Sequence, residues 1–549
     1  MTNLTGMLKA GQMSRSLITV SVFAALFVGI GLRSVSVAMS DTGAAETHRT
    51  ERLDALGRAD IYDRNGELLA TSVTVYSLFA DPRAIWDAAD VVSALTRVFP
   101  DLDTEAVTER LENRERAFVW IKRGLTPRQR QAVFDLGLEG LGFRAERQRA
   151  YPRGAQAGHV LGHTNVDGRG QMGVELALDD RLRQRDDPVR LSLDSGVQFA
   201  LEVELNRAAK EYDISGAAGV VLHARTGEVR ALASWPQFDP NRPRQADDHV
   251  RLNRASGIVY ELGSVFKPLT IAAALGSGQI SEDEVFDVRS KLVINGFEIT
   301  DTHRGAPQMS AAIVLAESSN IGTVRIAERL GDDGLAQAYG EFGLLGRTPV
   351  ELPGVAAPIL PPVWTELSNA TASYGHGIAV SPLAFARAFA ALANDGRLPE
   401  LTLLAGDEDA PPNTANGEQV SFVSAEIAAR LVSMMRAAVT DGTGKRANVP
   451  GYRVAGKTGT AEKPIAGGYA EDHNVNSFAA IFPSDRPEYV VLVVLDDPRL
   501  GGGPGGTAAL NAAPVAGRLI ERIAPLLSVA PVFDQAAPSE RASHERSVP

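Results

Sequence analysis

Three short motifs combine hydroxyl, amine and amide side chains that could perform acyl transfer. In chain order they are Ser264-Val265-Phe266-Lys267, Ser318-Ser319-Asn320 and Lys457-Thr458-Gly459-Thr460. Residues three apart share one face of a helix, so we expect Ser264 and Lys267 to bring a hydroxyl and an amine within hydrogen-bond reach. This pair predicts a serine nucleophile with its own lysine base.

The composition supports a special role for these lysines. The chain has 55 basic residues, of which only eight are lysines, and it has no cysteine. A catalytic base must lose its proton near neutral pH, which burial and neighbouring cations can arrange for lysine but not for arginine. The absence of cysteine excludes disulfides, thiolate catalysis and zinc ribbons. A covalent nucleophile must therefore be an oxygen or a lysine.

The specificity of the signal lies in the set of motifs. A single S-x-x-K tetrad is weak evidence, because a chain of 549 residues can contain one by chance. In isolation, an exposed helix turn is the better explanation. The three motifs in the required order are far more specific, and together they resemble the S-x-x-K, S-D-N and K-T-G set of penicillin-binding proteins and class A β-lactamases.

Lys457 also belongs to a second pattern. Residues 451–458, GYRVAGKT, match the Walker A pattern and would predict an NTPase. A phosphate-binding loop follows a buried strand and opens a helix. Here residues 448–451, NVPG, indicate a turn, and the proline and glycines within 464–468 interrupt any following helix. The NTPase interpretation is therefore disfavoured.

The elements that must position these motifs lie in the second half of the chain. From Val189 the pattern predicts a helix at 196–210, followed by two strands joined at Thr226-Gly227. Further strands are expected late, in NSFAAIFPS and YVVLVVLDD, with helices between. We expect one domain over residues 189–528, with an antiparallel sheet flanked by helices. Residues 529–549, rich in Ala, Ser and Pro, are expected to be a disordered tail.

An α+β accessory domain is expected over residues 41–188. Asn65-Gly66 predicts a β-hairpin turn within residues 57–70, and the apolar spacing in 84–140 predicts helices. His159 and His163 stand at helical spacing and could be a metal pair. Gly158 and Gly162 weaken a helix there and no third ligand stands out, so we predict structural histidines and no metal site.

The N-terminus predicts a membrane anchor. Residues 16–32 are uncharged, Lys9 and Arg15 precede them, and Arg33 follows. We expect a cytoplasmic segment at 1–15, a single transmembrane helix at 16–37 and a periplasmic remainder. Ser36-Val37-Ala38 leaves a cleaved signal peptide as the alternative. The net charge of -12 gives no general attraction to nucleic acid, which we do not expect as a partner.

Several longer segments resemble class B penicillin-binding proteins of the cell-division type. They are GRADIYDRNGELLA at 57–70, NRA at 253–255 with ELGS at 261–264, YGHG at 374–377, SPL at 381–383, GTGK at 442–445 and GKTGTAEK at 456–463. Leu262 stands where the family usually has proline, a change we expect to be tolerated. The resemblance extends from the anchor to about residue 525, and it implies a penicillin-binding, serine β-lactamase-like transpeptidase domain in an α+β multidomain chain.

The resemblance also implies the roles of individual residues. Ser264 would be acylated by the D-Ala-D-Ala end of a peptidoglycan stem peptide, with Lys267 as its base. Ser318 would relay a proton near the leaving nitrogen, Asn320 would hold the substrate amide and Lys457 would supply positive charge. The substrate-binding residues would be Thr458, Gly459 and Thr460, and the backbone N–H groups of Ser264 and Thr460 would form the oxyanion hole. No cofactor is implied.

The partners and the alternatives follow from the same resemblance. It implies stem peptides as substrates, β-lactams as inhibitors, the membrane, a polytopic glycan-polymerising glycosyltransferase and other division proteins. An elongation-type class B protein shares all three motifs, although the size and the short accessory region favour division. A D,D-carboxypeptidase or β-lactamase and a non-catalytic penicillin-sensing protein remain further alternatives.

Overall fold

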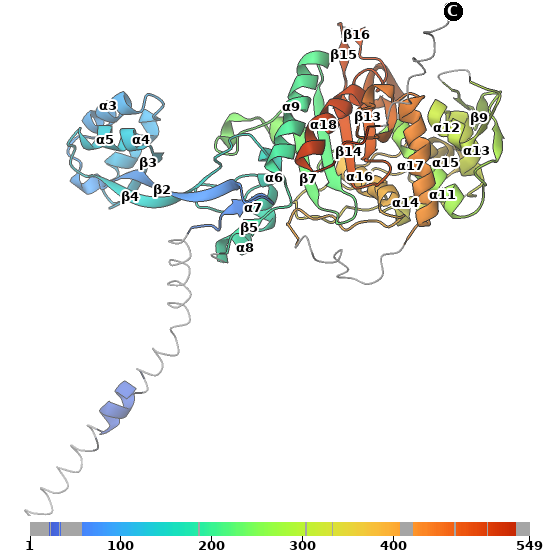
Figure 1. The fold of residues 1–549 in the computed structure, drawn as a ribbon. Helices are drawn as coiled ribbons and strands as arrows, with labels where there is room; N and C mark the ends of the chain where they lie inside the picture. Colours follow the sequence, from blue (N-terminus) through green and yellow to red (C-terminus); the bar gives the residue numbers. More distant parts are fainter. Residues whose placement is uncertain are drawn as a thin grey trace, which may run out of the picture. The chain divides into compact units, whose positions relative to one another are not determined.

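The computed structural model describes residues 21, 24–31, 33, 57–184, 187–301, 305–331, 333–406, 421–465, 468–501 and 503–533 (Figure 1). The chain forms two compact units. One comprises Met1–Arg58 and Thr74–Gln148, and the other comprises Ala59–Val73 and Arg149–Pro549. Residues 59–73 and 149–188 thus group with the larger unit, and the domain boundary at 188/189 stays a prediction.

The smaller unit is built around a cluster of buried apolar side chains. Helices α3 (Ala88–Val98), α4 (Thr104–Glu112) and α5 (Pro127–Phe134) supply Leu95, Leu111 and Val133 to this cluster. The helices expected within 84–140 are therefore present. Strand β3 (Val119–Leu125) lies in the same range, and the alternate residues Val119 and Ile121, both β-branched, are buried at its start, as is typical of a strand.

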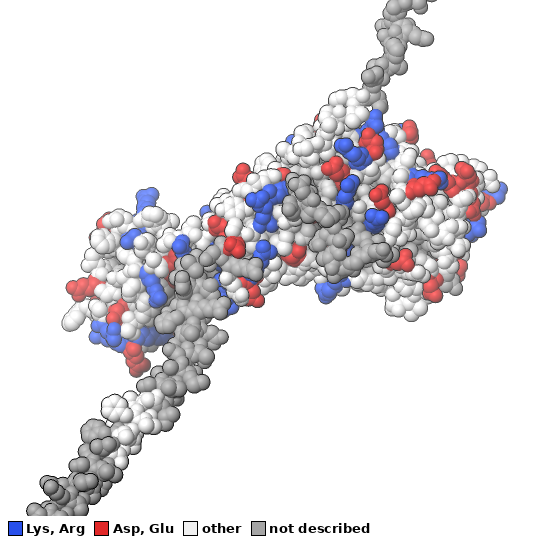
Figure 2. Space-filling view, turned by 60° about the horizontal axis from the view of Figure 1, so that its bottom comes forward, with Lys and Arg blue, Asp and Glu red and all other residues white. Residues whose placement is uncertain are grey.

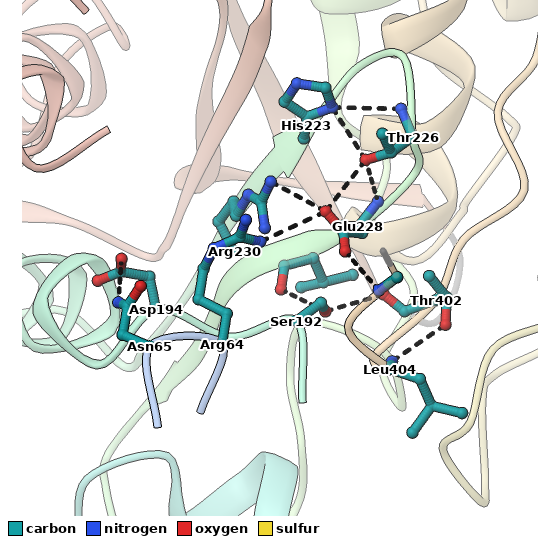
Figure 3. Close-up of polar contacts among 12 residues, drawn as sticks. Arg64, Asn65, Ser192, Asp194, His223, Thr226, Glu228, Arg230, Thr402 and Leu404 are labelled. Carbon is teal, nitrogen blue, oxygen red and sulfur yellow. Dashed lines mark hydrogen bonds and ion pairs between the residues drawn. The ribbon is translucent and has the colours of Figure 1, made fainter. Parts of the chain in front are cut away.

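The expected hairpin is present in the larger unit. Strand β1 (Ile61–Tyr62) pairs antiparallel with β2 (Leu68–Ala80), and Gly66 adopts a φ of 85° in the turn. Strand β5 (Val189–Arg190) pairs parallel with β1. The tip is attached by side chains: Asn65 Nδ2 donates to Asp194 Oδ2 at 2.9 Å, and Arg64 pairs with Glu228 at 3.4 Å (Figure 3). These contacts hold the tip of the hairpin to Asp194 and Glu228 of the larger unit.

An antiparallel sheet with the order β12-β13-β14-β6-β7 forms the centre of the larger unit (Figure 1). Its strands are β6 (Gly216–His223), β7 (Val229–Trp235), β12 (Ala455–Ile465), β13 (Gly468–Phe482) and β14 (Tyr489–Asp496). All eight residues of β14 are buried. Such a continuous apolar run is typical of a strand covered on both faces, which confirms the predicted helix-flanked sheet.

Helices cover both faces of this sheet. Helices α9 (Ser195–Tyr212) and α18 (Ala512–Leu526) share one apolar cluster with Val491 and Val493 of β14. The alternating residues Val490 and Leu492 join the other cluster, which includes α11 (Lys267–Gly276) and α16 (Pro382–Ala390). Successive side chains of a strand point to opposite faces of the sheet. Alternate residues of β14 therefore belong to the two different apolar clusters.

The surface is mixed in charge. Figure 2 shows basic and acidic side chains interspersed over the face in view. Exposed pairs include Arg289 with Asp287 at 2.5 Å and Lys291 with Glu298 at 2.5 Å. Pairs of this kind contribute little to stability, so the two apolar clusters dominate the energetics of the larger unit.

The anchor and the tail fall largely outside the described residues. Of the predicted span at 16–37, residues 21, 24–31 and 33 are described, and they are helical and exposed. Within the part of the chain that the structure describes, no helix has the length and apolar character needed to cross a membrane. The predicted tail lies outside the described residues from position 534 onwards.

Candidate active site

The predicted nucleophile lies at the start of a helix. Residues Gly263–Phe266 form a 3-10 turn, η3, and α11 begins at Lys267. Side chains three residues apart lie above one another in a 3-10 turn. Ser264 and Lys267 therefore lie on the same side of this turn, although the α-helix begins at Lys267 and not, as expected, at Ser264. Gly263 has a φ of 64°, and a Cβ there would lie 2.8 Å from Thr460 O. Glycine thus lets the turn approach β12.

Lys267 is fully buried and donates to the second motif. Its Nζ donates to Asn320 Oδ1 at 2.8 Å, to Ser318 Oγ at 3.2 Å and to the Ser318 carbonyl oxygen. Among the described residues, no hydrogen bond joins the side chains of Ser264 and Lys267, so the expected contact is not made in this structure. Catalytic hydrogen bonds often tighten only when substrate binds. Loss of one proton from Nζ would leave a lone pair for the serine hydroxyl.

Lys457 donates to the hydroxyl of Ser318 as well. It is fully buried on β12, and its Nζ donates to Ser318 Oγ at 2.8 Å and to Thr458 O at 3.1 Å. The residues after Lys457 continue the strand and pair with β13. A P-loop would require a helix there, so the structure excludes the Walker A interpretation.

The second motif joins two helices. Ser318 follows α12 (Ala311–Glu317) with a left-handed φ of 61°, and Asn320 opens α13 (Asn320–Glu328). Ser319 caps α13 by accepting from Gly322 N at 2.9 Å. This break between helices presents Ser318 and Asn320 to the lysines while Ser319 stays buried.

The third motif is packed closely against the nucleophile turn. A Cβ at Gly459 would lie 2.2 Å from the Leu262 carbonyl oxygen and 2.5 Å from Ser477 Oγ. Ser477 Oγ in turn donates to Leu262 O at 2.9 Å. Only glycine at 459 allows β12 to approach the turn this closely.

The two threonines of this motif have different partners. Thr458 Oγ1 shares a hydrogen bond of 2.8 Å with Thr443 Oγ1, and Thr460 Oγ1 accepts from Ala508 N at 3.0 Å. The Thr458 hydroxyl could still turn to a substrate oxygen, because the hydroxyl of Thr443 can act as either donor or acceptor. The structure therefore places the eight predicted site residues on η3, α11, the junction of α12 and α13, and β12.

Burial shifts the protonation of both lysines. The pKa of Lys267 lies well below its ordinary value, chiefly because of burial and also because of the charge of Lys457, while Asp301 opposes the shift. Burial lowers the pKa of Lys457 to about 7. Lys457 can therefore exchange a proton near neutral pH, and burial favours the neutral amine of Lys267, as a general base requires.

Several residues near the site were not predicted to belong to it. Asp301 accepts hydrogen bonds from Ser319 Oγ at 2.7 Å and Asn320 N at 2.6 Å. Tyr469 OH donates to Glu261 Oε2 at 3.2 Å, and the ring of His376 lies 5.9 Å from that of Tyr469. Burial first, and then the charge of Lys267, lowers the pKa of His376 to about 4. The family-like segment YGHG at 374–377 could have pointed to His376, whereas no sequence motif contains Asp301.

His159 and His163, whose helical spacing could have indicated a metal pair, are distant from the three motifs in the sequence. His159 is buried, its Nε2 contacts Val250 O at 2.8 Å, and its ring packs edge-on against Phe238. Burial lowers the pKa of His159 to about 4. The ring is therefore neutral near pH 7 and has a backbone partner, as expected for a structural histidine.

A serine at a helix start, two buried lysines and a bridging hydroxyl, all at the edge of an antiparallel sheet, define a serine acyl-transfer site. Two family models match the chain: "Penicillin binding protein transpeptidase domain" over residues 217–521 and "Penicillin-binding Protein dimerisation domain" over residues 55–209. The chain belongs to the penicillin-binding protein transpeptidase family.

Curated relatives and a solved structure support this family assignment. The chain is 39% identical to a probable peptidoglycan D,D-transpeptidase FtsI of Caulobacter vibrioides, over 94% of this chain and 89% of the relative. It is 34% identical to a probable peptidoglycan D,D-transpeptidase PenA of Neisseria gonorrhoeae, over 91% and 90%. It superimposes on penicillin-binding protein 3 of Mycobacterium tuberculosis, crystallised with aztreonam, with a TM-score of 0.67 and 28% identity, covering 88% and 99%.

Proposed function

We propose that this chain is a peptidoglycan D,D-transpeptidase that cross-links stem peptides through an acyl-enzyme on Ser264. The observation that supports this most directly is the convergence of Lys267 and Lys457 on the hydroxyl of Ser318. Such a chain of donors and acceptors can move a proton between a nucleophile and a leaving group. The related FtsI and PenA proteins are named as enzymes of this activity.

The first step would form an ester. Ser264 Oγ attacks the carbonyl carbon of the penultimate D-Ala, and its proton passes to the neutral amine of Lys267. The backbone N–H groups of Ser264 and Thr460 would stabilise the oxyanion. The C–N bond then breaks, and Ser318, held by Lys457, would pass its proton to the departing D-Ala nitrogen and take the proton that Lys267 received. Positive charge on Lys457 and the Thr458 hydroxyl would hold the terminal carboxylate.

The second step would form the cross-link. A neutral amine of a neighbouring stem peptide attacks the ester carbonyl and loses a proton to the neutral amine of Lys267. The Ser264–acyl bond then breaks, and the serine oxygen regains a proton through Lys267. Use of water in place of the amine would give a D,D-carboxypeptidase or a β-lactamase. The accessory domain, which matches a dimerisation family model, supports a polymer-linking enzyme instead.

β-Lactams would inhibit the protein by the same chemistry. The lactam carbonyl takes the place of the D-Ala carbonyl, the C–N bond opens, and the leaving amine stays tethered to the acyl group. Deacylation is then slow. The likeness to a solved penicillin-binding protein with bound aztreonam supports this part of the proposal.

We further propose a septal role at the inner membrane. The predicted anchor at 16–37 would hold the chain by a single pass with its N-terminus in the cytoplasm, and the catalytic domain would face the periplasm. A glycan-polymerising glycosyltransferase and other division proteins would be its partners. The likeness to FtsI supports division over elongation. Depletion of the protein tests this role, because filaments indicate division and rounded cells indicate elongation.

Turnover of a stem-peptide thioester by the full chain tests the enzymatic proposal. Release of the thiol, with acyl transfer to an added D-amino acid, is expected from wild type and not from Ser264→Ala. If wild type is folded and shows neither thiol release nor β-lactam binding, the proposal is wrong, and a non-catalytic role would then fit the data better.

A further inference from the structure

Asp301 lies beside the second motif although it comes from a separate part of the chain. It follows the hairpin of strands β9 (Leu292–Ile294) and β10 (Phe297–Ile299). It precedes Ser319 by 18 residues, and its side chain is partly buried. The hairpin therefore delivers a carboxylate to a site otherwise built from hydroxyl, amide and amine groups.

The carboxylate binds the first turn of α13 with both oxygens. Oδ2 accepts from Ser319 Oγ at 2.7 Å, while Oδ1 accepts from the backbone N–H groups of Asn320 at 2.6 Å and Ile321 at 3.0 Å. The free N–H groups at a helix start favour an acceptor with negative charge. Asp301 is therefore an external cap on the helix that begins with Asn320.

The backbone next to Asp301 orients the Asn320 side chain. Asn320 Nδ2 donates to the Thr300 carbonyl oxygen at 3.0 Å, and Asn320 Oδ1 accepts from Lys267 Nζ at 2.8 Å. A carbonyl oxygen accepts only from the amide nitrogen, and an ammonium donates only to the amide oxygen. Residues 300 and 301 thus fix both the position and the orientation of Asn320 against Lys267.

Asp301 also changes the charge balance around Lys267. Among the residues that the structure describes, the charged and titratable groups with a resolved effect on Lys267, or a resolved response to its charge, are Lys457 on β12, His376 after α15 (Glu366–Ser373) and Asp301. His376 is neutral near pH 7, since its pKa is lowered to about 4, chiefly by burial. Lys457 lowers the pKa of Lys267, and Asp301 raises it. The two groups therefore have opposite effects on the same amine.

We infer that Asp301 is a positioning residue for acyl transfer, which holds Asn320 against Lys267 and places one negative charge near Lys267. This inference rests on the proposed function. Asp301 does not touch the reacting atoms in this arrangement, because it acts through Asn320 and through its charge. Two measurable quantities should therefore respond to its loss: the acylation rate, through geometry, and the pH at which Lys267 titrates, through charge.

The test is the second-order rate of acylation by a fluorescent penicillin, measured on the full chain from pH 5 to pH 9. Asp301→Asn keeps the shape and removes the charge. We expect a rate about 10- to 100-fold lower, because small misplacements of catalytic groups have effects of this size. We also expect the acid limb to move to lower pH, since Lys267 loses the charge that raises its pKa.

Two variants separate this role from ordinary helix capping. Asp301→Glu retains the charge, so its acid limb should stay at the wild-type position while its rate falls. Asp87→Asn removes a comparable cap, which accepts from Ala89 N and Asp90 N at the start of α3 in the smaller unit. It should change neither quantity.

Several outcomes would overturn the inference. A wild-type rate in Asp301→Asn, or a slower rate with an unmoved acid limb, would leave Asp301 as a structural cap only. If Asp301→Asn does not fold, Asp301→Glu decides by itself, and either a wild-type rate or a displaced limb would contradict the inference. A wild-type protein that takes up no label would instead refute the proposed function.

Discussion

Lys457 Nζ donates to Ser318 Oγ at 2.8 Å, across 139 positions of sequence. Ser318 also accepts from Lys267 at 3.2 Å, so one hydroxyl oxygen receives hydrogen bonds from two fully buried amines. A buried charge without partners is costly, and the amine of Lys457 depends on this oxygen and on Thr458. The contact therefore links the two lysines both structurally and chemically.

Replacement of Ser318 by alanine should disable acylation. The change removes the shared acceptor and leaves two buried amines to lose protons or partners. We expect acylation by a fluorescent penicillin to fall about 100-fold or more, the usual scale of a proton-transfer contribution. Ser310→Ala, at the cap of α12 where Ser310 makes no side-chain cap bond, is the matched control. Equal rates in Ser318→Ala and wild type would contradict the relay.

The acylation rate should depend on pH through both lysines. Lys267 must be neutral to accept a proton, and its lowered pKa makes the neutral amine available well below pH 10. Lys457 is needed in its protonated form, so activity should decline as pH rises through about 7. The limbs report macroscopic values of the coupled pair. Lys267→Arg should slow acylation and abolish the acid limb, and an unchanged profile in that variant would exclude Lys267 as the base.

Gly459→Ala should distort the site through the backbone. The added Cβ would lie 2.2 Å from the Leu262 carbonyl oxygen, which can only be relieved by separating β12 from the nucleophile turn. We expect a lower Tm and a penicillin acylation rate at least about 10-fold lower. Gly346→Ala is the control, because a Cβ there meets nothing within 4 Å. A normal acylation rate in Gly459→Ala would show that the turn tolerates displacement.

Glu202 should make the stability of the protein depend on pH. Burial raises its pKa to about 7, against the partial opposing effect of hydrogen bonds from Gln198 and Ala157. Because the folded state holds this proton more tightly, its contribution is fully present below the unfolded pKa. It is lost as pH rises through about 7. The loss is about 1.4 kcal/mol for each pH unit in which only the unfolded state is ionised.

Thermal unfolding at a series of pH values tests this effect. Wild type should lose stability between pH 5 and pH 8, and Glu202→Gln should remove part of that slope because its side chain stays neutral. Glu109→Gln, at an exposed position on α4, should keep the wild-type slope. If Glu202→Gln and wild type have parallel curves, Glu202 is not the group that titrates.

The sequence allowed much of this architecture to be predicted. The continuous apolar run in residues 489–495 predicted a strand, and β14 occupies that range. The resemblance of the three motifs to those of penicillin-binding proteins implied one site for Ser264, Ser318 and Lys457, and the structure joins Lys457 to Ser318 directly. The helical pattern in 84–140 did not predict β3, because short apolar runs are ambiguous between helix and strand.

The parts that sequence could not predict depend on tertiary contact. Asp301 stands in a stretch without periodic pattern, and its partner Asn320 is reached only through the β9–β10 hairpin. The left-handed conformation of Ser318 is another such feature, since serine rarely adopts it without support from its surroundings. A third such feature is the hydrogen bond from Ala508 N to Thr460 Oγ1. The two residues are 48 positions apart, and no sequence motif contains Ala508.

The mass of the intact protein after incubation with benzylpenicillin tests the central claim most directly. We predict one covalent adduct, equal to one penicillin, on wild type, slow formation on Lys267→Arg and none on Ser264→Ala. The serine is the only part of the site that forms a covalent bond in this account. A folded wild type without an adduct, or an adduct that persists on Ser264→Ala, would contradict the assignment of Ser264 as the nucleophile.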